Sequence, residues 1–233
     1  MQIALQRIRE CINGRQGRLD LSNLDLVYLP SLPDGLIELR CSNNRLISLP
    51  RLPSSLEILY CSSNQLTSLP HLPSSLKTLT CQFNQLKTLP SLPTSLVMIL
   101  CDVNQLTNLP DLPAHLTYIS CSMNQLMSLP SLSHGLEKLY CSDNLLQTLP
   151  DLPLTLTGLA CELPYNNHIF VSNELTSNQI VQLNQENHEW MESQSKVRTM
   201  ERCLIYYEEL MHNRWHPDRV FYLRKMGYMP SDM

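Results

Sequence analysis

The sequence predicts an α/β repeat solenoid, in which one short strand from each repeat joins a parallel β-sheet on the concave side. Three observations predict this fold. A pattern of twenty residues, LxxLxCxxNxLxxLPxLPxx, recurs without a change of length between residues 18 and 163. Leucine, cysteine and asparagine occupy fixed columns of the pattern. The apolar columns can be buried only if each repeat, here called a rung, stacks on its neighbours.

The first seventeen residues are expected to form an N-terminal helical cap, because an end rung would otherwise expose core side chains. Apolar residues recur there at helical spacing: Ile3, Leu5, Ile8 and Ile12. This spacing predicts an amphipathic helix over residues 2–12 that ends near Asn13-Gly14. The solenoid itself is expected over residues 18–164.

One strand and one extended connection are predicted in each rung. In LEILYCSSN, residues 56–64, the alternation places Leu59 and Cys61 in the core and Tyr60 on the concave face. The following LPHLPSSL stretch contains Pro70 and Pro73, which exclude a regular helix. Extended, polyproline-like backbone is therefore expected on the convex side.

The cysteine column is predicted to be a buried ladder of reduced thiols. Its spacing of twenty residues, with no histidine column beside it, is unlike the close cysteine pairs of zinc sites, so no metal and no cofactor are expected. Disulfides between neighbouring rungs are the alternative, because adjacent strands lie about 4.8 Å apart. The cysteine ladder consists of Cys41, Cys61, Cys81, Cys101, Cys121, Cys141 and Cys161.

The asparagine column lies where each rung turns away from its strand. Asparagine side chains can hydrogen-bond backbone groups that a buried turn would leave unpaired, which predicts a second structural ladder. The asparagine ladder consists of Asn44, Asn64, Asn84, Asn104, Asn124 and Asn144.

These columns resemble the leucine-rich repeat family and, within it, the short LPX type, named after Leu-Pro pairs such as Leu69-Pro70 and Leu89-Pro90. Such repeats are found in secreted bacterial effectors and, in similar form, in large DNA viruses. The resemblance covers about two thirds of the chain and implies a short horseshoe with a parallel concave β-sheet.

Residues 165–233 are expected to form an α-helical C-terminal region. Thr176 and Gln179 have the spacing of a capping box, and apolar residues recur at steps of three and four over residues 196–212, which predicts an amphipathic helix. A second short helix is predicted from Pro217 to Lys225. The segment YYEELMHNRWHPDRVFYLRKMGY, residues 206–228, resembles the C-terminal segment of giant-virus repeat proteins, which implies a protein acting inside a host cell.

No catalytic residue is predicted. The chain has no GxSxG, HExxH or glycine-rich phosphate loop. Some LPX effectors carry a ubiquitin ligase domain with a Cys-x-Asp motif, which occurs here only as Cys141-Ser142-Asp143, in the repeat register. Cys203 is expected on the buried face of its helix, with no activating partner at a defined spacing. An effector role linked to ubiquitin transfer through the C-terminal region is kept as the alternative function.

Composition and net charge limit the classes of ligand that the chain is expected to bind. The formal charge of -4 suggests neither nucleic acid nor an acidic membrane as a ligand, and no segment has the length of a membrane span. No small-molecule substrate is evident. The first residues place Arg7, Arg9 and Glu10 where a signal peptide needs an apolar run, so we expect an intracellular protein, located in the host cytoplasm.

Protein binding through the concave face is the function that the sequence predicts, with the chain acting as a noncatalytic adaptor for an unidentified protein partner. Large apolar residues gather at outward strand positions and near the strand ends, as at protein interfaces. The alternative is that these are ordinary exposed residues of a sheet. Tyr118 and Met98 are expected to be the anchors. The candidate binding residues are Tyr60, Phe83, Met98, Leu100, Tyr118, Met123 and Tyr140.

Overall fold

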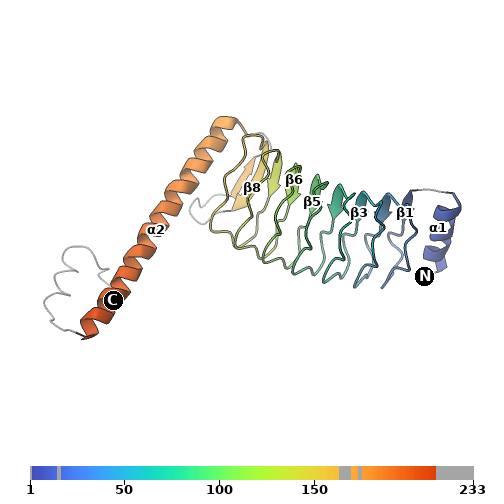
Figure 1. Ribbon diagram of the computed structural model, residues 1–233, viewed down its shortest axis with the longest axis horizontal. Helices are drawn as coiled ribbons and strands as arrows, with labels where there is room; N and C mark the ends of the chain where they lie inside the picture. Colours follow the sequence, from blue (N-terminus) through green and yellow to red (C-terminus); the bar gives the residue numbers. More distant parts are fainter. Residues whose placement is uncertain (1, 15–16, 163–168, 173–174, 214–233) are drawn as a thin grey trace. The chain divides into compact units, whose positions relative to one another are not determined.

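The computed structural model describes residues 2–14, 17–162, 169–172 and 175–213 (Figure 1). The chain forms two compact units, residues 1–184 and 185–233. The first unit contains an N-terminal helix, all of the strands and the start of the second helix. The candidate site lies in this unit.

Nine strands form one sheet in chain order, and the first eight are parallel (Figure 1). The register advances by one rung from strand to strand, so that Leu39 pairs with Leu59 and Leu59 with Leu79. The predicted solenoid with a parallel sheet is therefore confirmed. The parallel strands are β1 (Arg18–Asp20), β2 (Glu38–Arg40), β3 (Ile58–Tyr60), β4 (Thr78–Thr80), β5 (Met98–Leu100), β6 (Tyr118–Ser120), β7 (Lys138–Tyr140) and β8 (Gly158–Glu162).

The core is a single cluster built from the leucine and cysteine columns. In β3 and the residue that follows it, Leu59 and Cys61 are fully buried while Tyr60 between them is half-buried. The convex connections contain turns in which the N–H of Leu56 donates to the carbonyl of Pro53, 3.1 Å away. These connections contain no helix, because proline cannot supply the N–H donors that a helix needs.

Helix α1 (Gln2–Asn13) has the predicted position, but it buries a different face. Its buried residues are Ala4, Ile8 and Cys11, whereas Ile3 and Ile12 are 57% and 54% exposed. The observed stripe follows the helical steps of four and three, and the small Ala4 lets the helix approach the first rung closely. The sequence-based choice of the bulkiest apolar residues was therefore wrong for Ile3, Leu5 and Ile12.

The last rung ends in a strand pair that the repeat pattern did not predict. Strand β9 (Ile169–Ser172) runs antiparallel to β8, so the sheet ends with a reversal of chain direction. Helix α2 (Ser177–Asn213) follows as one continuous helix, longer than the predicted segment at 196–212. The second helix predicted at 217–225 lies outside the described residues.

The start of α2 packs on the solenoid. Thr176 and Gln179 form the predicted capping box, with the Thr176 N–H donating to Gln179 Oε1 at 2.9 Å and the Gln179 N–H donating to Thr176 Oγ1 at 3.4 Å. Ile180 is fully buried. Asn184 exchanges two hydrogen bonds with the backbone of Leu152, at 2.9 and 3.0 Å. The first two turns of α2 thus cover the C-terminal end of the core.

Candidate functional site

Three outward side chains, Met98 of β5, Tyr118 of β6 and Tyr140 of β7, lie near one another on the concave face. Met98 and Tyr118 are register partners on adjacent strands. The rings of Tyr118 and Tyr140 lie 5.6 Å apart at 57°. All three residues are half-buried, as expected for side chains that stand beside neighbours on a sheet. Three of the predicted binding residues therefore meet on adjacent rungs.

Leu100 and Tyr60 lie outside this three-residue cluster. Leu100 is half-buried in β5, where its register partners are Thr80 and Ser120. Tyr60 belongs to β3, and the guanidinium of Arg40 lies over its ring at 5.1 Å from the centroid. This contact is a cation–π interaction, so the face of Tyr60 already has a partner within the chain.

Phe83 and Met123 lie in the turns after β4 and β6 rather than on the strands. They are 56% and 54% exposed. Both have positive φ angles, 54° for Phe83 and 55° for Met123. They therefore stand at the carboxyl-end border of the sheet, next to the cluster on the strands but in a different backbone environment.

A hydrogen-bond network around Asp102 is the part of the concave face that sequence reasoning missed. Its Oδ1 accepts hydrogen bonds from the Ser120 hydroxyl and from the Ser122 N–H, the latter at 2.9 Å. Its Oδ2 accepts one from Gln82 Nε2 at 2.9 Å. Burial raises the pKa of the Tyr118 phenol, and Tyr140 and the Asp102 carboxylate raise it further. The available signal was that Asp102 is charged, whereas the same outward position holds serine or glutamine in the two rungs on either side of it.

The asparagine ladder joins each rung to the one before it. Asn104 is representative: its Oδ1 accepts from the N–H of Leu86 at 3.0 Å. Its Nδ2 donates to the carbonyls of Cys81 and Cys101, at 3.1 and 3.0 Å. Equivalent hydrogen bonds, to the backbone groups at the corresponding positions, are made by Asn64, Asn84, Asn124 and Asn144. Asn44 makes the equivalent bond to the first rung, at the carbonyl of Leu21. Every buried polar side-chain atom of the described residues has a partner.

The cysteine ladder runs through the core behind the concave face. All seven members are buried and are not disulfide-bonded. Several donate to the carbonyl of the next rung, as Cys61 does to Thr80 at 3.3 Å and Cys101 to Ser120 at 3.3 Å. Burial raises the pKa of the Cys41 thiol to about 12 and that of Cys101 well above its ordinary value. These thiols are therefore protonated at neutral pH and are poor nucleophiles and poor metal ligands.

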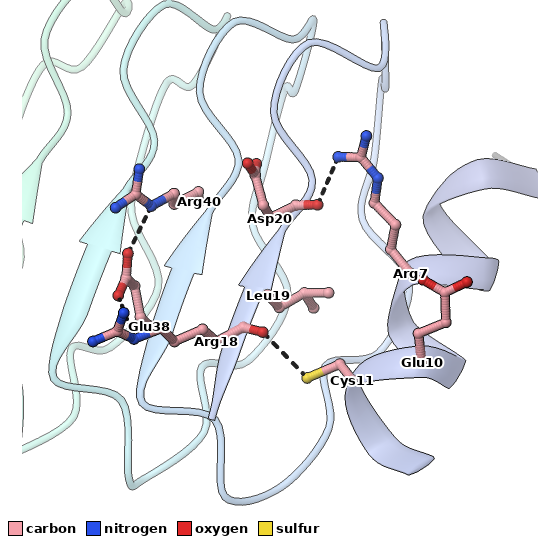
Figure 2. Close-up of a pocket in the computed structure, with 8 residues that line it drawn as sticks. All are labelled: Arg7, Glu10, Cys11, Arg18, Leu19, Asp20, Glu38 and Arg40. Atoms are coloured by element: carbon pink, nitrogen blue, oxygen red, sulfur yellow. Dashed lines mark hydrogen bonds and ion pairs between the residues drawn. The ribbon is translucent and has the colours of Figure 1, made fainter. Parts of the chain in front are cut away.

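A cavity between α1 and the first strands (Figure 2) has a volume of about 470 Å³. Its lining residues are Arg7, Glu10, Cys11, Arg18, Leu19, Asp20, Glu38 and Arg40.

The polar groups of this cavity bind one another. Arg7 donates to the carbonyl of Asp20 at 2.9 Å and Cys11 to that of Arg18 at 3.5 Å, which ties α1 to β1 (Figure 2). The Glu38 carboxylate is 2.6 Å from Arg40 Nε and 3.2 Å from Arg18 Nε. Glu38 is only 5% exposed, so it is not presented to a partner as a free charge. The cavity is best explained as the junction between the N-terminal helix and the solenoid.

The described part of the chain contains no group of three or more His, Cys, Asp or Glu side chains placed to hold a metal ion. None of the helices found there is long and apolar enough to cross a membrane. The side chain of Cys203 lies outside the described set.

Solved structures provide the comparison with known proteins. YopM, a leucine-rich effector protein from Yersinia pestis, is 38% identical with a TM-score of 0.67, over 75% of this chain and 48% of that one. YopM from Yersinia enterocolitica is 40% identical with a TM-score of 0.68, over 70% of this chain and 37% of that one. The chain thus spans less than half of either YopM.

The third comparison covers most of the domain structure that it matches. The leucine-rich repeat domain of a Shigella effector is 34% identical with a TM-score of 0.60, over 69% of this chain and 73% of that one. No family model and no curated protein sequence matches the chain. The shared rungs, the continuous parallel sheet and the identity to three effector structures lead to one conclusion: the chain belongs to the effector-like leucine-rich repeat proteins.

Proposed function

We propose that the chain is a noncatalytic adaptor that binds a protein partner through its concave face. The observation that carries this proposal is the cluster of Met98, Tyr118 and Tyr140 on three adjacent rungs. Aromatic and methionine side chains held on a rigid frame lose little conformational entropy on binding and are enriched at interface centres. The likeness to effector proteins supports an interaction module.

The geometry also indicates where binding energy would concentrate. Tyr118 touches Tyr140 and neighbours Met98, so truncation of Tyr118 would loosen the whole cluster. The polar groups around Asp102 border the cluster and already have hydrogen-bond partners. Typical interfaces likewise have polar groups around an apolar centre. Tyr60, whose ring is covered by Arg40, is expected to contribute less.

The test is an affinity capture from eukaryotic cell lysate with three baits. The first is the full chain, and the second carries Tyr118→Glu with Met98→Glu. The third is a matched control, Ile47→Glu with Met127→Glu, at two residues that are 54% and 69% exposed and lie away from the strands. Circular dichroism verifies that each bait is folded.

Partners kept by the control bait and lost by the concave variant are the expected result. A loss of at least tenfold corresponds to about 1.4 kcal/mol, a modest value for an interface anchor. Partners that the concave variant retains at full yield would refute the proposal, because the two buried charges cannot be accommodated at a packed interface.

The proposal also covers the type of repeat, the source of the protein and its location in the cell. The Leu-Pro pairs favour the LPX type, and the segment at 206–228 favours a giant-virus protein in the host cytoplasm. Neither nucleic acid, nor a membrane, nor a small molecule is proposed as a ligand. Expression of a fluorescent fusion in host cells tests the location, and an exclusively extracellular or organellar signal would contradict it.

The alternative function, ubiquitin transfer through the C-terminal region, depends on Cys203, whose side chain the structure does not describe. A thioester assay with loaded conjugating enzyme tests it directly. A ubiquitin adduct that disappears on reduction and in Cys203→Ala would replace the adaptor proposal with the enzymatic one.

A further inference from the structure

In the second to seventh rungs, the turn after the strand holds one residue in the left-handed backbone region. Asparagine and aspartate accept this conformation readily, whereas bulky and β-branched residues pay on the order of 1–3 kcal/mol for it. In each of these rungs the residue immediately precedes the ladder asparagine. The φ angles are Asn43 56°, Ser63 55°, Phe83 54°, Val103 53°, Met123 55° and Asp143 54°.

Three adjacent rungs carry the costly residues at this position: Phe83, Val103 and Met123, here called the rim. Their turns are hydrogen-bonded to one another, since the Phe83 N–H donates to the Asp102 carbonyl and the Val103 N–H to the Ser122 carbonyl, both at 3.0 Å. Successive rim residues are therefore about 4.8 Å apart. Phe83 and Met123 are more than half exposed, so burial does little to offset the backbone strain.

The fold gains nothing evident from this choice, because Asn43 and Asp143 fill the same position in other rungs with residues that suit it. Strained backbone that stability does not explain is concentrated at functional sites. An exposed apolar strip on neighbouring rungs is also the kind of surface that binds a partner. Both properties indicate a contact surface at the rim.

The charges beside the rim define the chemistry of the partner. In β4 to β7, the rim position and the position before it carry two charged side chains, Asp102 and Asp143. Asp143 is exposed. Asp102 accepts three hydrogen bonds, and an ionised carboxylate can accept about four. Lys138 lies at the other end of its strand. The charged side chains beside the apolar rim are therefore both acidic.

We infer that the rim docks a segment of a protein partner that is both apolar and basic. Its apolar side chains contact Phe83, Val103 and Met123, and a lysine or arginine lies beside Asp102 and Asp143. The inference rests on the proposed function and extends it, because it assigns a border of the sheet to recognition and states the partner's chemistry. It also adds Val103 and two carboxylates to the set of contact residues.

The test uses three short fluorescent peptides as probes: alternating Leu and Lys, alternating Leu and Glu, and alternating Ser and Lys. Binding to the full chain is measured by fluorescence anisotropy. The rim variant carries Phe83→Asn, Val103→Asn and Met123→Asn, and the charge variant carries Asp102→Asn and Asp143→Asn. Asparagine suits the left-handed position, so the rim variant is expected to be at least as heat-stable as the wild type.

The Leu/Lys peptide is expected to bind the wild type best and to lose at least about tenfold in affinity with the rim variant. The charge variant is expected to lose severalfold and to show a weaker salt dependence. Reduced binding together with equal or raised thermal stability separates recognition from a structural role, because a structural role would lower both.

Three outcomes would overturn the inference: no measurable binding of the Leu/Lys peptide to the wild type, equal binding to the wild type and the rim variant, or equal binding of the Leu/Glu peptide. The Tyr118→Glu and Met98→Glu variant separates this failure from failure of the proposed function. Peptide binding that is lost there and kept in the rim variant would overturn the rim and leave the concave face as the binding surface.

Discussion

Asn104 shows how one side chain secures two rungs. Its amide accepts from the Leu86 N–H and donates to the carbonyls of Cys81 and Cys101. Asn104→Ala leaves these groups without partners in a setting that admits little water, so we expect the free energy of unfolding to fall by about 3 kcal/mol. Urea unfolding measures it.

The neighbouring Gln105 provides the control for this prediction, because its side chain is exposed. Gln105→Ala is expected to change stability by less than about 0.5 kcal/mol. Equal effects of the two substitutions would show that the ladder contributes no more than surface residues do.

The cysteine ladder is expected to make the free energy of unfolding fall at alkaline pH. The pKa of Cys41 is about 12 in the folded chain and 9.0 for the ordinary thiol. Above pH 9 the unfolded chain releases protons that the folded chain keeps, so the stabilisation is complete below pH 9 and is lost as pH rises toward 12. The urea concentration at the unfolding midpoint is expected to stay constant between pH 7 and 9 and to decrease above pH 9.

Cys41→Ala removes one titrating group and is the matched variant for the pH series. The variant is expected to start from a lower stability and to lose less of it between pH 9 and 11. An identical pH dependence in both proteins would rule out Cys41 as a contributor.

At the scale of elements, α1 offers two isoleucines with opposite environments. Ile8 is 8% exposed in the core and Ile12 is 54% exposed on the same helix. Ile8→Ala is expected to cost about 2–4 kcal/mol and Ile12→Ala less than about 0.5 kcal/mol. Thermal unfolding of the two variants compares them, and a larger loss for Ile12→Ala would mean that the helix packs through another face.

The repeat pattern allowed the elements of the solenoid to be predicted because twenty-residue spacing leaves few ways to bury its leucines. Leu59 and Cys61 could be placed in the core and Tyr60 on the concave face from alternation alone. Outside the repeat this constraint is absent. The buried face of α1 depends on how closely a small Ala4 lets the helix approach, and β9 depends on pairing across a turn that no repeat dictates.

The candidate site was predictable in part for the same reason. Position in the rung placed Met98 and Tyr118 side by side on the sheet. The backbone conformation of Phe83 and Met123 was not evident, because neither residue type favours positive φ. Nor was the Asp102 network, whose members come from three rungs and meet only when the strands are in register.

At the scale of the whole chain, the start of α2 should decide whether the solenoid is soluble alone. A chain of residues 1–184 keeps Ile180 in the core and the Asn184 contact with Leu152. A chain of residues 1–175 loses both and exposes the last rung. The shorter chain is expected to be less stable by about 3 kcal/mol and to aggregate on gel filtration.

Equal stability and a monomeric elution of both truncations would contradict this role of α2. The longer truncation serves as its own reference, because it retains every rung and differs only in nine residues of helix and its cap. The comparison therefore isolates the covering of the end from the rest of the C-terminal region.

The uniform register between rungs has a consequence for how this protein can evolve. Every internal junction joins the same columns, Leu39 to Leu59 and Leu59 to Leu79, so removal or duplication of one complete repeat recreates a junction of the same chemistry. Recombination between the nearly identical repeats can thus lengthen or shorten the recognition surface without a folding defect. The ends, which carry α1 and α2, are the parts that must be inherited intact.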